Sequence, residues 1–477
     1  MKTTIFPLHL LLIAGTPIAG VSASDVRSWR NDGNGLYPAA QVATDWANAS
    51  QVKWETLLPA RGNGCLILVG GKLFFTAEPS TLICADAATG KILWEKPNEY
   101  ADLMEMPPGK SEEMKAALGK AKEIDEKAAP LERELYREER RLRRNQDDAT
   151  LRARVDELKK QIGELRKEGG PQAEQLKKPS AHDTNGYSSY TPVSDGKHVW
   201  ACFGTGVVVC YDLAGKRVWH KRTDNPDHDW GGASSPTLVD GKLIIRFSDH
   251  VALDPATGKE LWRTPSSGVA FNCPANFKLD DKHYLFTARG ELIRASDGKK
   301  LPSEALTGTA KPWCFFNTPS VIGDRIYTAH GSEGEQGEAH SYEIPKTAAL
   351  LEKDGLKKLW NTEINKNRYY SSPLVHEGLV YLISRDYQMQ ALDAASGEIA
   401  YSEKIKGFSG TAYPSLTLAG NVIFVGAEDG NAAFVKPGRT FEEISRTKVD
   451  PYRSTPIFDG ELCYLRTHEK LRAIHAK

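Results

Sequence analysis

Several signatures of catalysis are missing from this sequence. No two cysteines are adjacent, and no Cys-x-x-Cys-His haem motif, His-Glu-x-x-His zinc motif, serine nucleophile elbow or phosphate-binding glycine loop occurs. The seven cysteines are an odd number, so at least one thiol is unpaired, and none of their spacings matches a zinc site. The sequence therefore gives no motif that assigns an enzyme class.

The sequence also has no excess of charge and no long hydrophobic run. Its 62 basic residues balance 62 acidic residues, which gives no reason to expect nucleic acid as a partner. The apolar stretch from Leu8 to Ile18 is too short and too interrupted by proline and glycine to span a membrane. With Lys2 before it and Val21-Ser22-Ala23 after it, this stretch is typical of a cleaved secretory signal, and a buried N-terminal strand is the alternative. We predict a signal peptide at residues 1–23 and a periplasmic or secreted protein.

A phrase that ends in tryptophan recurs along the chain. It is Asp-Ala-Ala-Thr-Gly-Lys-Ile-Leu-Trp at residues 86–94 and Asp-Pro-Ala-Thr-Gly-Lys-Glu-Leu-Trp at residues 254–262, with a shortened copy at 212–219 and a worn copy at 393–401 that ends in Tyr401. A strand that ends at Asp, a tight turn that needs Gly and a second strand with a large aromatic residue explain this pattern.

A second phrase, a small or polar residue followed by proline and an apolar strand, gives the period of the repeat. Its prolines are Pro192, Pro236, Pro274, Pro319, Pro373, Pro414 and Pro456. Their spacing is the length of a four-stranded propeller blade. Because Cys65–Trp94 forms a first unit, we predict an all-β, eight-bladed β-propeller. Seven blades are the alternative, since the unit at residues 268–301 is degenerate.

The last repeat unit has only three predicted strands and needs an outer one. Residues 52–55, Val-Lys-Trp-Glu, are similar to the end of the repeat phrase. We predict that this N-terminal strand completes the last blade and leaves no sheet edge unpaired.

The Asp-x-x-Thr-Gly-Lys-x-x-Trp phrases resemble the tryptophan-docking repeats of the pyrroloquinoline-quinone (PQQ) propellers, and Ser28 to Gly35 resembles the lead-in of exported bacterial members. This family includes quinoprotein alcohol dehydrogenases and the assembly lipoprotein of the Bam complex. The resemblance, over residues 28–98 and 184–477, implies the fold but not one function, because the scaffold has catalytic and non-catalytic members. Catalytic members need a calcium-bound quinone, and no carboxylate or Asn here can be matched to its calcium ligands. We therefore predict no cofactor. PQQ and calcium are the alternative, which no motif supports.

Residues 99–182 interrupt the repeats with a segment rich in Lys, Arg and Glu. Apolar residues at coiled-coil spacing form two seams: Met114, Leu118, Ala121, Ile124, Ala128, Leu131 and Leu135, and then Leu151, Val155, Leu158, Ile162 and Leu165. We predict an antiparallel helical hairpin with a kink or break at Pro130 and a turn and helix cap at residues 145–148. Its charges are either a solvated surface or a protein-docking arm. The flanking parts are residues 24–98, with the closing strand and blade 1, and residues 183–477, with blades 2–8.

The loops before the proline-anchored strands carry the candidate site. Equivalent loops meet at one mouth of a propeller channel, so their polar and aromatic residues should form one rim. The candidate ligand-binding residues are His182, Asp183, Tyr187, His228, Asp229, Trp230, Asn272, Trp313, Asn317, Arg368, Tyr369, Tyr413 and Arg453. The alternative is that the aromatic residues pack between blades. Asp227-His228-Asp229 is a candidate metal ligand set or general base, but we assign no metal site and no catalytic residue.

These observations favour an exported, non-catalytic propeller that binds a protein or an extracellular small molecule or carbohydrate. The alternative is a propeller enzyme, either an unusual quinoprotein or a metal-assisted carbohydrate-active enzyme, with its site at the channel mouth.

Overall fold

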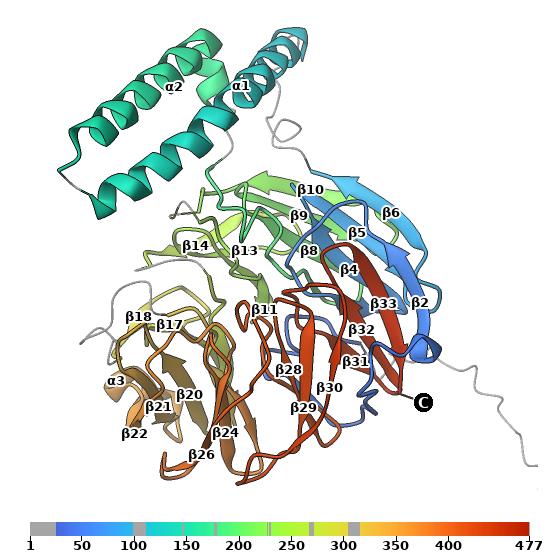
Figure 1. The fold of residues 1–477 in the computed structure, drawn as a ribbon. Coiled ribbons are helices and arrows are strands. Elements are labelled where there is room, and N and C mark those ends of the chain that lie inside the picture. Colours follow the sequence, from blue (N-terminus) through green and yellow to red (C-terminus); the bar gives the residue numbers. More distant parts are fainter. Residues whose placement is uncertain are drawn as a thin grey trace, which may run out of the picture.

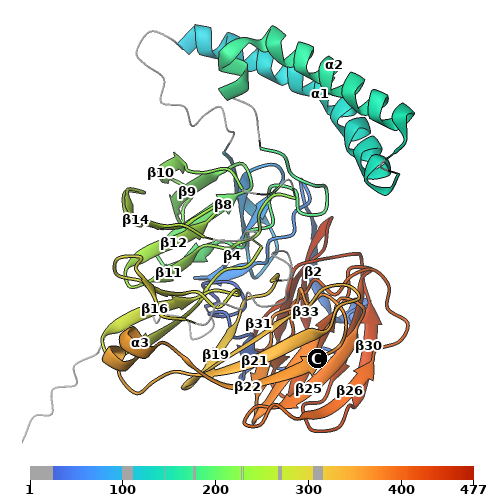
Figure 2. The ribbon, with the colours of Figure 1, turned by 90° about the vertical axis from the view of Figure 1, so that its left-hand side faces the viewer.

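The computed structural model describes residues 25–98, 111–145, 147–175, 179–226, 228, 230–266, 271–303 and 315–476, and in these residues eight sheets form a ring (Figures 1 and 2). The prediction of an eight-bladed propeller is confirmed. The seven-bladed alternative is wrong, because the degenerate unit contributes a complete four-stranded blade. The predicted signal peptide lies outside the described residues.

Blades 1 to 4 follow one another along the chain, each starting with the strand nearest the ring axis. Blade 1 contains β3 (Ile67–Val69), β4 (Lys72–Ala77), β5 (Thr81–Asp86) and β6 (Ile92–Pro97). Blade 2 contains β7 (Val193–Ser194), β8 (His198–Phe203), β9 (Val207–Asp212) and β10 (Arg217–Arg222). Blade 3 contains β11 (Thr237–Val239), β12 (Lys242–Arg246), β13 (His250–Leu253) and β14 (Glu260–Thr264). Blade 4 contains β15 (Ala275–Leu279), β16 (Lys282–Phe286), β17 (Leu292–Arg294) and β18 (Lys300–Leu301).

Blades 5 to 8 complete the ring. Blade 5 contains β19 (Ser320–Ile322), β20 (Arg325–His330), β21 (Gly337–Glu343), the short helix α3 (Ala348–Asp354) and β22 (Lys357–Ile364). Blade 6 contains β23 (Leu374–His376), β24 (Leu379–Ile383), β25 (Gln388–Asp393) and β26 (Ile399–Lys404). Blade 7 contains β27 (Thr417–Ala419), β28 (Val422–Gly426), β29 (Asn431–Val435) and β30 (Glu443–Lys448). Blade 8 contains β31 (Ile457–Asp459), β32 (Leu462–Arg466) and β33 (Lys470–His475).

The outer strand of blade 8 comes from the N-terminal part of the chain. A 3-10 turn, η1 (Ala49–Gln51), leads into β2 (Val52–Leu57), which pairs antiparallel with β33 and places Trp54 opposite Ala473. The predicted closure of the ring by an N-terminal strand is therefore confirmed.

The recurring Asp-to-Trp phrase joins neighbouring blades at several places in the ring. In blade 1, the Asp86 carboxylate accepts hydrogen bonds from the Thr89 N–H (2.8 Å) and hydroxyl (2.7 Å), and Gly90 has a φ of +74°. The Trp54 indole of blade 8 lies against Gly90, where a Cβ atom would clash with the ring, and its N–H donates to the Ala87 carbonyl at 3.1 Å. Both the positive φ and the close approach require glycine at this turn.

The segment before η1 crosses the ring, which the sequence did not predict. Val26 forms a β-bridge with Leu68 of blade 1, and β1 (Leu36–Tyr37) pairs in parallel with β27 of blade 7. Between these anchors, Arg30, Asn31 and Asp32 have φ values of 52°, 48° and 63°, a left-handed run that is unusual for residues other than glycine. The segment is held in this conformation by its contacts with the inner strands.

The helical hairpin stands outside the ring, on the side of β9 and β10 (Figures 1 and 2). It consists of α1 (Ser111–Arg144) and α2 (Ala149–Gln175). The Asp148 carboxylate caps α2 by accepting from the Thr150 and Leu151 N–H groups, each at 3.0 Å. Of the kink or break predicted at Pro130, the break does not occur, because α1 continues through Pro130. No described helix has the length and apolarity that crossing a bilayer requires.

Candidate functional site

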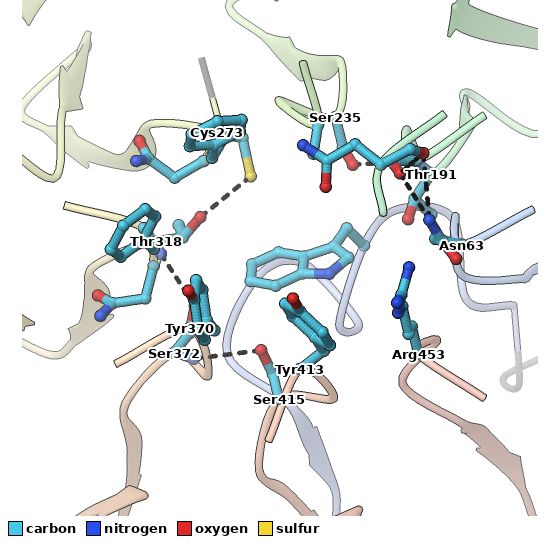
Figure 3. A pocket seen from close by; sticks show the side chains of 18 of the residues that line it. Asn63, Thr191, Ser235, Cys273, Thr318, Tyr370, Ser372, Tyr413, Ser415 and Arg453 are labelled. Atoms are coloured by element: carbon cyan, nitrogen blue, oxygen red, sulfur yellow. Dashed lines mark hydrogen bonds between the residues drawn. The ribbon is translucent and has the colours of Figure 1, made fainter. Parts of the chain in front are cut away.

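A cavity of about 570 Å³ opens at the end of the ring where the chain enters the inner strands. Its lining comes from the loops of all eight blades and from Trp29 of the crossing N-terminal segment. Figure 3 shows these side chains arranged around the cavity. The expectation that the loops before the inner strands meet at one mouth therefore agrees with the geometry.

The deepest layer of the cavity wall is a belt of eight small residues, one from each blade. The belt residues are Cys65, Thr191, Ser235, Cys273, Thr318, Ser372, Ser415 and Thr455, and all of them are buried. The side chain of each belt residue faces the belt residue of a neighbouring blade. The dashed lines in Figure 3 show several of these contacts.

Hydrogen bonds run along the belt from blade to blade. Backbone N–H groups donate to the next belt side chain in six places, for example from Thr318 to the Ser372 hydroxyl at 2.9 Å and from Thr455 to the Cys65 sulfur at 3.2 Å. The Cys273 thiol and the Thr318 hydroxyl are 3.3 Å apart. Within the described residues, the belt has no such bond between Ser235 of blade 3 and Cys273 of blade 4. The belt thus satisfies backbone groups that would otherwise be buried without partners.

A second layer, the collar, lies two residues before the belt in each blade. The collar residues are Asn63, Ser189, Ala233, Phe271, Phe316, Tyr370, Tyr413 and Arg453, and each is half-buried where the belt residue is buried. An offset of two places both residues on the same side of an extended chain, so both point toward the ring axis.

One half of the collar is aromatic. The Phe271 and Phe316 ring centroids are 6.0 Å apart, those of Phe316 and Tyr370 are 4.7 Å apart, and those of Tyr370 and Tyr413 are 5.0 Å apart. The Arg453 guanidinium lies over the Tyr413 ring at 5.0 Å and ends this arc. Offset and tilted pairs of this kind are favourable contacts for aromatic rings, and they leave ring edges and faces toward the cavity.

The other collar residues are Asn63, Ser189, Ala233 and Arg453, and Asn63 and Ser189 form a small polar wall with the loop of Thr184 and Asn185. The Asn63 amide donates to the carbonyl oxygens of Thr184 (2.8 Å) and Asn185 (3.1 Å) and to the Ser189 hydroxyl (3.1 Å). The same loop is anchored by a half-buried carboxylate of blade 1.

That carboxylate is Glu78, which accepts hydrogen bonds from the Tyr187 and Ser188 N–H groups, each at 2.9 Å. Gly186, with a φ of +58°, lies so close to it that a Cβ atom would overlap the Glu78 carboxylate. Burial raises the pKa of Glu78 above its ordinary value. The polar wall is therefore fixed by backbone contacts with blade 1.

Two arginines give the lining its charge. Arg453 pairs with Glu428 and donates to the Thr184 carbonyl, so it connects blade 8 to the polar wall. Arg368 lies 3.4 Å from the Tyr370 hydroxyl and 3.9 Å from the Glu333 carboxylate. Of the lining residues that the structure describes, none is Asp or Glu.

Most of the predicted rim residues that the structure describes line the cavity. These are His228, Trp230, Asn272, Asn317, Arg368, Tyr413 and Arg453. His182 does not line it but stacks on the Trp230 ring, with centroids 4.1 Å apart and an interplanar angle of 5°. Asp229 and Trp313, like Asp227, lie outside the described residues, so the Asp227-His228-Asp229 hypothesis stays a prediction.

Three predicted residues have other surroundings. The Asp183 carbonyl accepts from Arg61, and its side chain is not in the lining. The Tyr187 hydroxyl donates to the Pro179 carbonyl at 2.9 Å, and burial raises its pKa to about 12. Tyr369 is buried between blades 5 and 6, where its hydroxyl contacts Gln390 at 3.0 Å. The collar position of blade 6 is residue 370, one residue after Tyr369, so Tyr370 points into the cavity instead.

Sequence reasoning missed the belt, Trp29 and the aromatic residues Phe271 and Phe316. A signal was available: each belt residue is a small residue two positions before the start of its inner strand, and the collar residue stands two positions earlier still. Applied to all eight units, that offset selects the collar without coordinates.

A family model described as outer membrane protein assembly factor BamB matches residues 22–96, 204–313 and 293–474. The chain belongs to this PQQ-like propeller family. Among its relatives, BamB of Yersinia pestis is 23% identical over 273 residues, which cover 53% of this chain and 65% of the relative. Quinohemoprotein alcohol dehydrogenase ADH IIB of Pseudomonas putida is 28% identical over 141 residues, 26% of this chain and 20% of the enzyme. The chain thus spans less than two thirds of either relative.

Solved structures of the PQQ-like propeller family share the fold. The quinohemoprotein alcohol dehydrogenase of Comamonas testosteroni has a TM-score of 0.55 at 11% identity, covering 95% of this chain and 80% of the enzyme. The Pseudomonas putida alcohol dehydrogenase ADHIIG has a TM-score of 0.56 at 12% identity, with the same coverage. At these identities the similarity establishes the propeller and not the activity.

The described lining of this PQQ-like family member does not fit a calcium-bound quinone. Calcium takes about six to eight oxygen ligands, with carboxylates among them. The described lining offers hydroxyl and amide groups but no carboxylate, and its two cysteines, Cys65 and Cys273, belong to different blades. No step of a quinone reaction follows from these residues.

Proposed function

We propose that this chain is an exported, non-catalytic binding propeller whose cavity holds an organic group with a planar face, such as a sugar ring or an aromatic ring. The observation that carries the proposal is that an aromatic arc of the collar faces the polar wall of Asn63 and Ser189 across the cavity. A planar group stacked on the aromatic arc presents its edge to the hydrogen-bonding groups of the polar wall. Ligand pockets commonly combine apolar contact with a few polar groups that fix orientation.

The size of the cavity supports this assignment. A volume of about 570 Å³ lies within the range of about 300–1,000 Å³ for small-molecule pockets. Each favourable ring contact adds about 0.5–1.5 kcal/mol beyond the burial of apolar area.

A protein partner is compatible with the same site. The matched family model is described as an assembly factor, which supports protein binding for this chain. Thr184 and Asn185, which line the cavity, follow α2 in the chain. A short segment therefore joins the hairpin to the cavity wall. We propose that the hairpin is an accessory docking arm and that the cavity receives a side chain or glycan of the docked protein.

The anionic aromatic dye 8-anilinonaphthalene-1-sulfonate tests the cavity directly. We expect one dye molecule to bind per chain with increased fluorescence, and Tyr370→Ala to weaken this binding about tenfold, since it removes the central ring of the arc. Dye titration gives the affinity, and the melting temperature should change little because Tyr370 is only half-buried.

Phe441→Ala is the matched control. Phe441 packs against Tyr401 of blade 6 and is not part of the lining, so its loss should leave dye affinity unchanged. Equal weakening by both substitutions, or dye binding that Tyr370→Ala does not alter, would contradict the proposed site.

The alternative, a quinoprotein-type enzyme, is favoured only by the similarity to the quinohemoprotein alcohol dehydrogenase. Purified protein incubated with PQQ and Ca²⁺ is expected to show neither tight quinone binding nor alcohol-dependent reduction of a redox dye, because the described lining lacks a carboxylate to hold calcium. Absorbance of the quinone after gel filtration and a dye-reduction assay are the measurements. Robust turnover would replace the binding function by an enzymatic one.

A further inference from the structure

Outside the mouth cavity, blade 5 brings two histidines and a glutamate together. His330 is the last residue of β20, and Glu338 and His340 lie on β21. His330 and Glu338 are directly paired across the two antiparallel strands, and His340 is two residues further along β21. Paired residues and residues two apart on a strand share one face of a sheet, so all three side chains meet on the same face.

The three side chains converge through single atoms. His330 Nε2 is 3.1 Å from His340 Nε2 and 3.4 Å from Glu338 Oε2, and His340 Nε2 is 3.7 Å from Glu338 Oε2. A point equidistant from these atoms is about 2 Å from each, which is the length of zinc–nitrogen and zinc–oxygen bonds. Two imidazoles and one carboxylate are a common ligand set for zinc and for other divalent transition metals.

The surroundings hold these atoms in place. Asn361 on β22 lies 3.4 Å from Glu338 Oε1 and can donate to it, which leaves Oε2 toward the histidines. The His340 ring is stacked between those of His330 and Tyr342, with centroid distances of 5.2 and 6.2 Å. Burial lowers the pKa of His330 to about 4 and that of His340 to about 3, so both rings are neutral at pH 7.

We propose that His330, Glu338 and His340 form a binding site for one divalent transition-metal ion of the zinc class. The two histidine side chains are almost fully buried, and the Glu338 side chain is 28% exposed. The ion can therefore enter past Glu338 and keep a water molecule or a small anion in its remaining positions.

An ion at this site would link the end of β20 to the start of β21, on either side of the loop between them. That loop carries Glu333, which pairs with Arg385 at 3.1 Å and lies 3.9 Å from Arg368 in the cavity lining. The site is thus structural for blade 5 and also fixes the loop beside the mouth cavity.

The test uses tag-free, full-length protein and Co²⁺ as a spectroscopic probe for Zn²⁺. We expect one Co²⁺ per chain with visible d–d absorption, displacement of Co²⁺ by Zn²⁺, and a rise in melting temperature with added Zn²⁺. Glu338→Gln should weaken Co²⁺ affinity by at least about tenfold, because it replaces a charged ligand by a neutral one of the same shape. His340→Gln should abolish the absorption band, and circular dichroism checks that this variant is folded.

Glu343→Gln on the same strand is the matched control, since the Glu343 side chain is 42% exposed and its carboxylate pairs with Lys357 at 3.3 Å. It should bind Co²⁺ as the wild type does. The proposal is overturned if wild-type protein takes up no Co²⁺ or Zn²⁺ at micromolar free ion, or if Glu338→Gln binds as tightly as Glu343→Gln. In either case the cluster is a hydrogen-bonded histidine pair.

Discussion

A chain that starts at Ala60 is expected to aggregate or assemble into oligomers, because it lacks the outer strand of blade 8. In the intact protein β2 covers β33 from Val52 to Leu57, and Glu55 pairs with Arg472 at 2.5 Å and with Lys470 at 3.2 Å. Without β2, the edge of β33 presents unpaired N–H and C=O groups that can pair with another chain. The contacts of Trp54 with blade 1 are lost at the same time. Size-exclusion chromatography with light scattering measures this effect.

The shortened chain also lacks the crossing segment, so a second variant is needed to separate the two losses. Because Val52 lies opposite Ile474, residues 48–59 can be attached after Lys477 through a short turn, which gives blade 8 an ordinary four-strand order. This rearranged chain is expected to be monomeric, although less stable than the intact protein. A shortened chain that stays monomeric with an unchanged melting temperature would contradict closure by β2.

Replacement of Arg30 by methionine should lower the free energy of unfolding by about 3–5 kcal/mol, because a buried charged donor is removed from several carbonyl groups at once. The Arg30 guanidinium donates to Gly33 and Asn34 in its own segment, each at 3.3 Å, and to Pro373 of blade 6 (3.2 Å) and Leu416 of blade 7 (2.8 Å). Burial lowers its pKa to about 10, so the group stays charged at neutral pH. Denaturant unfolding followed by circular dichroism measures the change.

Arg27→Met is the matched control for this substitution. The Arg27 side chain is 36% exposed and pairs with Asp25 at 3.0 Å, and an exposed pair of this kind contributes at most about 1 kcal/mol. Similar losses of stability in the two variants would show that the guanidinium of Arg30 has no special role in holding the segment across the ring.

The sequence predicted the ring well because the relevant signals are local and repeated. The proline spacing and the Asp-to-Trp phrase mark each blade, and Trp54 identified the closing strand although its partner Ala473 is at the other end of the chain. The path of residues 25–37 was not predictable in this way. Its left-handed backbone at Arg30, Asn31 and Asp32 exists only because inner strands of distant blades hold it.

The sequence predicted where the site lies, but not which residue of each loop points into the cavity. Loops before the inner strands had to converge, but whether Tyr369 or Tyr370 points inward depends on the backbone conformation of a loop without a clear periodicity. The cluster of His330, Glu338 and His340 was missed for a related reason. The spacing from His330 to Glu338 matches no metal-binding motif, and the residues meet only once the pairing of β20 with β21 is known.

The separation of belt and collar has a consequence for how such a protein can acquire new ligands. The belt closes the ring with small side chains and backbone N–H groups, while the collar contacts the ligand two residues earlier in the same loops. A collar residue can therefore be exchanged without removing a bond of the belt. Substitutions at collar positions far apart around the ring should change affinity additively, whereas neighbours in the aromatic arc, whose rings are in contact, should be coupled.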